Sequence, residues 1–429
     1  MTKSFFKIIA LFFSFLHAST VFALTYSTAV TSVSDFFSSV SEDENAGSTT
    51  FLSLNIPFGG RAESLGSAYT GLSDDISFFD YNAAASSMLD ETEIAVFHNA
   101  WISDSALETL AATTRFGDFG MGAAIKCFYV PFTEYDYFGN KQTGGYYSET
   151  TGILNFSYHF LHGYYFKGIS LGVNLKGAWR AMPDYADENG AIVSGLSQSA
   201  AAVMADFGAL TRFSFLKFFQ SREPNCSVGL SIKNVGAAWT GFSEKIAQDD
   251  PIPTQISAGT SYKPFEAFTF TADFSQPINL FSPAESEQWS AGIGMIFQIT
   301  EPFALLSGFL LKGGNPRMSL GGEALYKGVQ VNINYTLDLT TSFNPVNHIS
   351  LSAKIKLGDR GRAELAAKVD ALYIEGLEKY AAGDYEGALL AWQNALKLNP
   401  GFDPAKKGIL IAERQRLLVE KIREMQSLE

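Results

Sequence analysis

Few residues of this chain have the type and spacing that catalysis requires. The segment Gly168-Ile169-Ser170-Leu171-Gly172 matches the pattern G-x-S-x-G. A nucleophile elbow of that pattern joins a strand to a helix, whereas Ser170 falls in the middle of a strand-like segment. His159 and His162 lie at a strand end, where we expect a rim position rather than an ion site. Phosphate-binding loops, C-x-x-C pairs and H-E-x-x-H helices are also missing, so the sequence predicts a protein that is not an enzyme and uses no metal or cofactor.

Four cationic side chains have the right type to bind an anionic group. They are Arg115, Lys126, Lys176 and Arg180, and each falls on the polar face of a strand-like segment. If those strands enclose a lumen, a buried cation there could receive a carboxylate. The alternative is that each cation forms a structural ion pair with an acid of the plug or the wall. Both interpretations stay open at this point.

The strand-like segments run from about residue 92 to residue 358 and alternate with period two. In the segment VNINYTLDL, Val331, Ile333 and Tyr335 share one face, and Asn332 and Asn334 share the other. We expect about 14 antiparallel strands, an even number, with long links at one end and tight turns at the other. This pattern predicts an all-β transmembrane barrel over residues 92–358. A secreted pair of β-sandwiches is the alternative, in which the apolar face would be the core.

Residues 24–91 precede these strands and contain a segment that suits neither a strand nor an amphipathic helix. Glycines and aspartates dominate PFGGRAESLGSAYTGLSDDISFFDYNAAASSML, which predicts a compact irregular plug. Gly60, Arg61, Asp74, Asp75 and Asn82 stand at positions that resemble the N-terminal hatch of the FadL family of outer-membrane transporters, in particular its spirochaetal branch. The family's Asn-Pro-Ala is Asn-Ala-Ala here, so the fixed φ of proline is missing. A flexible glycine-rich linker is the alternative interpretation.

The resemblance implies a function for the whole chain. It implies a plugged barrel that carries long-chain fatty acids or a similar amphiphile across the outer membrane by passive gated diffusion, with the substrate leaving through an opening in the wall. The four cations named above would then meet the substrate's carboxylate. The alternative function is a barrel-anchored scaffold whose helical tail binds a periplasmic protein and transports nothing.

Composition and the N-terminus agree with an exported protein. Lys3 and Lys7 precede an apolar run, and Val21-Phe22-Ala23 supplies a cleavage site, so residues 1–23 are predicted to be a signal peptide. The predicted location is the outer membrane of a diderm bacterium, in contact with its lipid. A net charge of −13 argues against a nucleic-acid partner. Cys127 and Cys226 have no metal-type spacing and are interpreted as packing residues, with a disulfide left open.

After residue 358 the pattern becomes helical. Residues 363–382, 385–398 and about 404–425 are predicted helices, and residues 359–429 form a predicted periplasmic domain. The chain there resembles one tetratricopeptide repeat, and the residues that carry the resemblance are Gly376, Tyr380, Ala388, Trp392, Ala395 and Pro400. We expect Trp392 and Tyr380 to pack together across the helix pair. One repeat is fewer than a free-standing array needs, so support from the barrel, a second copy or a partner is expected.

Overall fold

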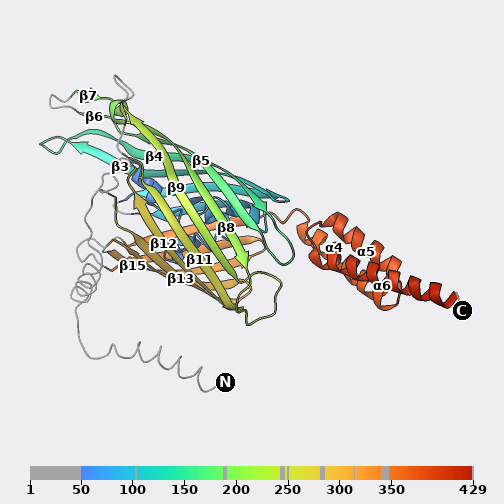
Figure 1. Ribbon diagram of the computed structural model, residues 1–429. Helices are drawn as coiled ribbons and strands as arrows, with labels where there is room; N and C mark the ends of the chain where they lie inside the picture. The colour runs from blue at the N-terminus through green and yellow to red at the C-terminus, as the bar shows by residue number, and fades with distance from the viewer. Residues whose placement is uncertain are drawn as a thin grey trace, which may run out of the picture.

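The computed structural model describes residues 50–101, 104–186, 191–241, 247–248, 251–280, 286–313, 315–339 and 347–427. The predicted signal peptide lies outside the described residues. A large β-barrel dominates the molecule, and a helical tail projects from one end of it (Figure 1). The barrel strands are β1 (Glu93–Ala100), β2 (Ala106–Phe116), β3 (Phe119–Tyr135), β4 (Lys141–Phe160), β5 (Ile169–Ala181), β8 (Ala200–Phe213), β9 (Cys226–Thr240), β11 (Thr254–Phe265), β12 (Phe268–Ile278), β13 (Ser290–Thr300), β14 (Phe303–Lys312), β15 (Asn315–Tyr326), β16 (Val329–Asp338) and β17 (His348–Lys356).

The barrel is closed and antiparallel. Strand β1 pairs with β2 on one side and with β17 on the other, and β8 pairs with both β5 and β9. Among the described residues, 14 long strands therefore form a continuous ring without a free edge. The two-residue strands β6 (Tyr185–Ala186), β7 (Ile192–Val193) and β10 (Ala247–Gln248) belong to the loops. The predicted strand number and pairing direction are confirmed.

The wall carries its apolar side chains on the outside. In β16, Val331 is 41% exposed and Ile333 57% exposed, whereas the intervening Asn332 and Asn334 are fully buried. The same alternation with apolar residues outward occurs in β1, β4 and β5. A soluble sandwich would bury the apolar face, so the sandwich alternative is wrong. An apolar exterior around a polar interior is the pattern of a transmembrane barrel.

The two ends of the barrel differ. Two-residue turns such as Gly117-Asp118 and Lys327-Gly328 join strands at one end, which we call the tight-turn end. Longer links, including those that carry β6 and β7, lie at the other, which we call the long-loop end (Figure 1). The sequence pattern predicts one of the long links over residues 131–145. Instead β3 and β4 continue as a paired hairpin with a tip near residues 136–140, because Val130, Phe132 and Tyr146 favour extended backbone.

The plug lies inside the barrel and is made of short elements. These are η1 (Leu52–Asn55), α3 (Arg61–Ser64), η2 (Ile76–Asp80) and η3 (Ala85–Met88). Phe58, Phe78 and Phe79 of the plug are buried against Phe97 and Ile153 of the wall. The apolar core of the molecule is thus the boundary between plug and wall, and we call residues 57–89 the hatch from here on. A compact, buried segment is not a flexible linker.

Glycines of the wall face the hatch and let its backbone touch the strands directly. A Cβ atom added at Gly308 would lie 2.0 Å from the Gly66 nitrogen, and one at Gly172 would lie 2.2 Å from the Ala83 oxygen. We call this set the wall glycines; its members are Gly120, Gly172, Gly208, Gly229, Gly259, Gly292, Gly308 and Gly321. A side chain at these positions would clash with the hatch. Hatch atoms therefore occupy the space that a Cβ atom would fill at each wall glycine, and we call these spaces the notches of the wall.

The tail consists of α4 (Arg362–Ala381), α5 (Tyr385–Leu398) and α6 (Asp403–Ser427). Asp384 caps α5, since its carboxylate accepts the Gly387 N–H at 2.9 Å. The tail contacts the tight-turn end, where Arg222 Nη1 lies 2.6 Å from Asp370 Oδ2 and the Tyr164 N–H donates to the Gly401 oxygen at 3.2 Å. In the described part of the chain, no helix has the length and apolar character needed to cross a membrane.

Candidate functional site

Arg61 lies at the centre of an ion network between the hatch and the wall. Its Nη1 is 2.6 Å from Glu323 Oε1 of β15, and its Nη2 is 2.9 Å from Asp74 Oδ2 within the hatch. Asp74 also accepts a hydrogen bond of 2.6 Å from the Tyr69 hydroxyl. Burial and the neighbouring Asp74 carboxylate raise the pKa of Tyr69 well above its usual value, so the hydroxyl keeps its proton and donates. The arginine therefore joins two hatch segments to one wall strand.

Asp75 connects the same network to a second wall strand, β17, which is separated from β15 only by β16. Its Oδ2 pairs with the ammonium of Lys354 in β17 and lies 3.8 Å from Arg61 Nε, and its Oδ1 accepts the Ser77 N–H at 2.8 Å. Burial alone would raise the pKa of Asp75, but the Lys354 and Arg61 cations hold it well below the usual value. The carboxylate is thus ionised, and it caps η2 while it binds two cations.

Other wall side chains bind side chains or backbone groups of the hatch. Glu63 of the hatch pairs with His348 and accepts a hydrogen bond of 2.6 Å from the Ser350 hydroxyl. Asp273 Oδ2 of β12 accepts the N–H groups of Tyr69 at 2.9 Å and Thr70 at 2.6 Å. Each of these contacts joins the hatch to a different part of the ring, so the hatch is bound on several sides.

Asn82 organises the hatch segment where the family's proline is missing. Its Nδ2 donates to the Thr70 oxygen in the hatch and to the Ala209 oxygen in β8, both at 3.0 Å. Its Oδ1 accepts the Ala84 N–H at 3.1 Å. Ala83 is held from the wall, since its oxygen accepts from Asn155 Nδ2 at 2.8 Å. Hydrogen bonds of the asparagine and of the wall therefore fix this path without a proline ring.

Two of the four predicted lumen cations are buried and paired. Lys126 Nζ lies 3.5 Å from Asp80 Oδ1 of the hatch and also donates to the Ile56 oxygen. Lys176 Nζ lies 2.6 Å from Asp206 Oδ2 of the neighbouring strand β8. Both side chains face the interior, as the strand alternation predicts, and each has an acidic partner.

The other two cations lie nearer the barrel ends. Arg115 Nε donates to the Gly117 oxygen at 2.6 Å, in the turn between β2 and β3. Arg180 Nη1 donates to the Thr50 hydroxyl at 2.6 Å, and its guanidinium lies 5.7 Å from the centre of the Phe51 ring. The structure therefore does not bring the four cations together in one site. Their contact with a substrate stays a prediction.

A cavity of about 440 Å³ lies on the long-loop side of the hatch. Its lining combines aromatic and apolar groups, among them Trp101, Phe128 and Leu310, with Arg317 and Ser319 of β15. Arg317 is half-buried, and its Nε has no hydrogen-bond partner among the described residues. The lining also holds a second cation, Lys312, and the carboxylates of Glu63, Glu149 and Glu287. A cavity of this size that offers both apolar surface and charged groups suits an amphiphile.

A second, polar cavity of about 200 Å³ lies on the tight-turn side of the hatch. It is lined by Arg61, Asp74, Asp75 and Glu323 of the ion network and by Lys356 near the end of β17. The network thus stands at the floor of the hatch, between the apolar cavity and the tight-turn end.

Ser170 of the G-x-S-x-G match does not have the backbone geometry of a catalytic nucleophile. Ser170 lies within β5, and its hydroxyl donates to the Ala84 oxygen of the hatch at 2.6 Å. A strand on both sides of Ser170 is not the strand-to-helix turn of a nucleophile elbow. Cys127 and Cys226 are free thiols.

The residues named for the helical tail meet around Trp392. This side chain is 2% exposed, and its ring centre lies 6.1 Å from that of Tyr380. A Cβ atom added at Gly376 would lie 2.2 Å from Trp392 Nε1, so only glycine fits there. Ala388 and Ala395 are buried in the same cluster, while Pro400 lies in the link between α5 and α6. Three helices are present, and the assignment to a tetratricopeptide repeat stays a prediction.

Sequence reasoning missed several partners of the hatch. Lys354 and Glu323 bind the hatch network, and Arg317 lines the apolar cavity. The alternation of Lys354 with Ile355 and Ala353 does place it on the inner face, so a signal existed. The alternation predicts which side chains face the interior. It does not predict which hatch residue each one contacts, because that depends on contacts between residues far apart in the sequence.

Comparisons with known proteins agree with this geometry. A "UPF0164 protein" from Treponema pallidum (strain Nichols) is 32% identical over 403 residues, which cover 92% of this chain and 90% of that protein. The solved structure of the Pseudomonas putida toluene transporter TodX has 10% sequence identity, covers 70% of this chain and 98% of that one, and gives a TM-score of 0.50. A Pseudomonas aeruginosa FadL homologue is also similar, at a TM-score of 0.41.

The TodX likeness concerns the fold alone, and it agrees with the plugged barrel expected from the sequence. The resemblance to a spirochaetal branch agrees with the relatives from Treponema pallidum, a second of which is 30% identical over 391 residues. Residues 25–360 match the family described as "Uncharacterised protein family (UPF0164)", and with a relative that matches over nearly its whole length, the chain belongs to this family.

Proposed function

We propose that the protein is an outer-membrane channel that carries hydrophobic or amphiphilic small molecules by passive gated diffusion. The observation that carries the proposal is the apolar cavity above a hatch that closes a membrane barrel. A substrate enters from the long-loop end, occupies this cavity and passes when the hatch rearranges. No energy source is required, since the substrate moves down its own gradient. A hydrophobic cargo is also what TodX is named for, a toluene transporter.

The substrate class we favour is the long-chain fatty acid. Arg317 supplies a cation for the carboxylate, and Trp101, Phe128 and Leu310 supply apolar surface for the chain. The Arg317 Nε without a partner among the described residues favours an acidic ligand over a neutral hydrocarbon. Lys126 and Lys176 stay candidates for contacts further along the route, where they are paired with Asp80 and Asp206.

Two variants of the cavity test this proposal. We expect Ser319→Trp to fill the cavity and to abolish both binding and liposome uptake of a fluorescent fatty acid, whereas Ser319→Ala should keep them. Arg317→Gln should weaken fatty-acid binding about tenfold or more, which corresponds to the loss of about 1.5–3 kcal/mol for a charge-assisted bond. It should leave binding of the matching long-chain alcohol unchanged. Arg222→Gln, at an exposed ion pair near the tail, is the matched control.

The outcomes separate the substrate from the mechanism. If Arg317→Gln weakened the binding of the fatty acid and of the alcohol equally, Arg317 would not recognise the carboxylate. The fatty-acid proposal would then fail, while the channel proposal would stand. Uptake by the Ser319→Trp variant at the parent rate would contradict the route through the cavity. Mass spectrometry of lipids that co-purify with the detergent-extracted parent identifies the bound species directly.

A scaffold function is the second candidate, and the surface of α6 supports it. This helix exposes several large apolar side chains, namely Leu410, Leu417, Leu418, Ile422 and Met425. In this proposal the tail lies in the periplasm and binds a protein there through these side chains. Deletion of residues 359–429 discriminates the two functions. Loss of a co-purifying protein with unchanged uptake supports the scaffold, and loss of uptake alone supports transport.

A further inference from the structure

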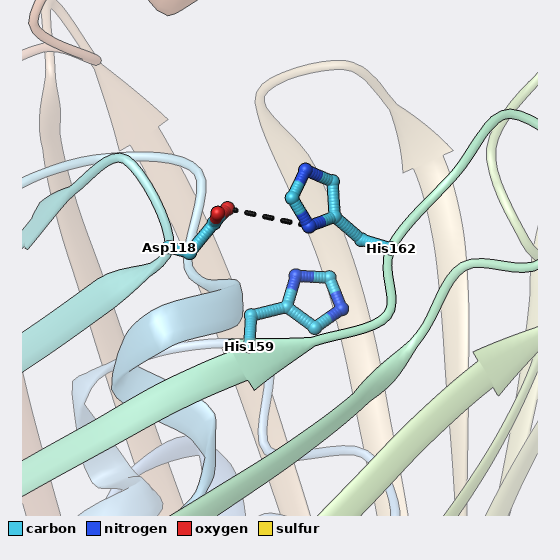
Figure 2. Close-up of side chains that lie close together, drawn as sticks. All are labelled: Asp118, His159 and His162. Atoms are coloured by element: carbon cyan, nitrogen blue, oxygen red, sulfur yellow. Dashed lines mark ion pairs between the residues drawn. The ribbon is translucent and has the colours of Figure 1, made fainter. Parts of the chain in front are cut away.

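Three potential metal ligands meet at the tight-turn end of the barrel. Asp118 belongs to the turn between β2 and β3, His159 lies near the end of β4, and His162 follows that strand (Figure 2). One ligand atom of each residue lies within 4.8 Å of the others. His162 Nδ1 is 3.5 Å from Asp118 Oδ1, and the two imidazole rings are stacked with centres 5.3 Å apart. The cluster lies outside the cavities and the hatch network described above.

His159 is held in the form that binds a metal. Its Nε2 lies 2.6 Å from the Lys167 backbone oxygen, and because a carbonyl only accepts, Nε2 carries the proton and donates it. Nδ1 then bears a free lone pair. The residue is only 8% exposed, yet Nδ1 has no hydrogen-bond partner among the described residues. Figure 2 shows this edge of the ring directed toward Asp118 and His162. Metal-binding histidines commonly donate their second ring nitrogen to a carbonyl in this way.

The backbone around the cluster keeps the ligands in place. The His159 N–H donates to the Asp118 oxygen at 2.9 Å, so the turn between β2 and β3 is bound to the end of β4. Gly168, which precedes β5, has a φ of +82°, and a Cβ atom there would lie 2.8 Å from His159 Nε2. A larger residue at position 168 would therefore disturb the bond that orients the imidazole.

We propose that Asp118, His159 and His162 bind a divalent transition metal ion, with Zn²⁺ as the best fit. Two imidazole nitrogens and one carboxylate oxygen match the ligand preference of Zn²⁺, whereas Mg²⁺ and Ca²⁺ favour oxygen ligands throughout. The side chains of Asp118 and His162 are 30% and 42% exposed, so the ion can enter from solvent and keep water in its remaining position.

The proposed ion would also support the docking of the tail. The loop that follows His162 carries Tyr164, whose N–H donates to the Gly401 oxygen and whose ring lies 5.3 Å from that of Phe402. A ligand at His162 fixes the start of this loop. The metal would thus join two turns of the barrel beside the point where the link between α5 and α6 rests.

Metal binding by the untagged full-length protein in detergent tests this proposal, because an oligohistidine tag would bind the same ions. Equilibrium dialysis against Zn²⁺, followed by elemental analysis, should give one ion per chain. His162→Ala and Asp118→Asn should each weaken the affinity at least about tenfold, which is the loss that even an outer partner of a metal ligand produces. Co²⁺ should give an absorption spectrum that both substitutions abolish.

His98→Ala is the matched control, because His98 Nδ1 lies 2.7 Å from Glu108 Oε1 on the outer face without a second histidine. This variant should bind Zn²⁺ like the parent. Parent-like binding by both His162→Ala and Asp118→Asn would show that they form only an ion pair, and the proposal would fall. It would fall equally if His98→Ala lost as much affinity as they did. His162 is exposed, so loss of the fold in its variant is not expected, and circular dichroism verifies this.

Discussion

At the scale of single residues, the floor of the hatch is a chain of alternating charges. Glu323, Arg61 and Asp75 follow one another from β15 across the hatch to Lys354 of β17, and Asp74 joins Arg61 from the side. Arg61 and Asp75 each lie between opposite charges, whereas Glu323 and Lys354 form the two ends of the chain. A fully paired chain of charges stabilises a buried site. Removal of one member is destabilising, because it leaves a buried charge without its partner.

Replacing Asp74 and Asp75 with alanine should therefore loosen the hatch. Two carboxylates that make charge-assisted bonds worth about 1.5–3 kcal/mol each would be lost, and Arg61 and Lys354 would be left without partners in the hatch. We expect larger and more frequent conductance steps in planar bilayers. The double variant Glu364→Ala and Glu375→Ala removes the same charge from exposed ion pairs of α4 and should behave like the parent. An aspartate double variant as silent as the parent would count against a gating hatch.

A wall glycine offers a steric test of the same fit. In Gly308→Val the new side chain would start 2.0 Å from the Gly66 nitrogen, and overpacking of this kind costs about 1–3 kcal/mol. We expect the hatch of this variant to become sensitive to protease while the strands persist. Gly322→Val is the control, because an added Cβ atom at Gly322 meets no atom within 4 Å. Equal protease resistance of both variants would contradict a tightly seated hatch.

At the scale of elements, the strands and helices were predictable and the hatch contacts were not. The alternation over residues 329–338 depends only on neighbours in the sequence, and so does the α5 helix, which spans Tyr385–Leu398 as expected. Other contacts depend on which strands are neighbours and on the position of each residue along the barrel axis. Examples are the contact of Gly66 with Gly308 and that of Asp118 with His159. Periodicity holds no information on that position, so a cavity-lining residue such as Arg317 cannot be told from any other inward cation.

The tail gives a prediction at the same scale. Trp392 packs on Gly376 and Gly408, and its Nε1 donates to the Tyr373 oxygen at 3.1 Å. Truncation of a buried tryptophan to alanine costs about 3–5 kcal/mol, which approaches the whole stability of a three-helix unit. We expect Trp392→Ala to unfold the tail and leave the barrel intact. Limited proteolysis should then rapidly degrade the chain after about residue 358 and leave a resistant remainder.

The control for this prediction is Leu390→Ala, since Leu390 lies on the same helix and is 56% exposed. It should keep the parent's resistance to protease. If the tail with Trp392→Ala resisted protease as well as the parent's tail, the contacts of the tail with the barrel, rather than its own core, would hold it folded.

At the scale of the whole molecule, the even number of strands returns the chain to its starting side. The N–H of Thr92 donates to the Gly358 oxygen at 2.9 Å, so the entry to the first strand and the exit from the last lie side by side. The tail begins at that point, at the tight-turn end. Bacterial barrels place their short turns on the periplasmic side.

We therefore predict a periplasmic tail. A protease added to intact cells should spare an epitope placed after residue 427 and should cleave it after lysis. Cleavage of the epitope in intact cells would refute this orientation. An epitope in the loop between β3 and β4, at the long-loop end, should be cleaved without lysis and serves as the positive control.

The notches of the wall bear finally on how the molecule is made. Hatch backbone rests in β5 at Gly172, in β8 at Gly208 and in β14 at Gly308, so it touches strands all around the ring. A finished ring would have to part its strand ladder to admit such a shape. We therefore expect the hatch to be in place before the last strands pair, so that the wall closes around it.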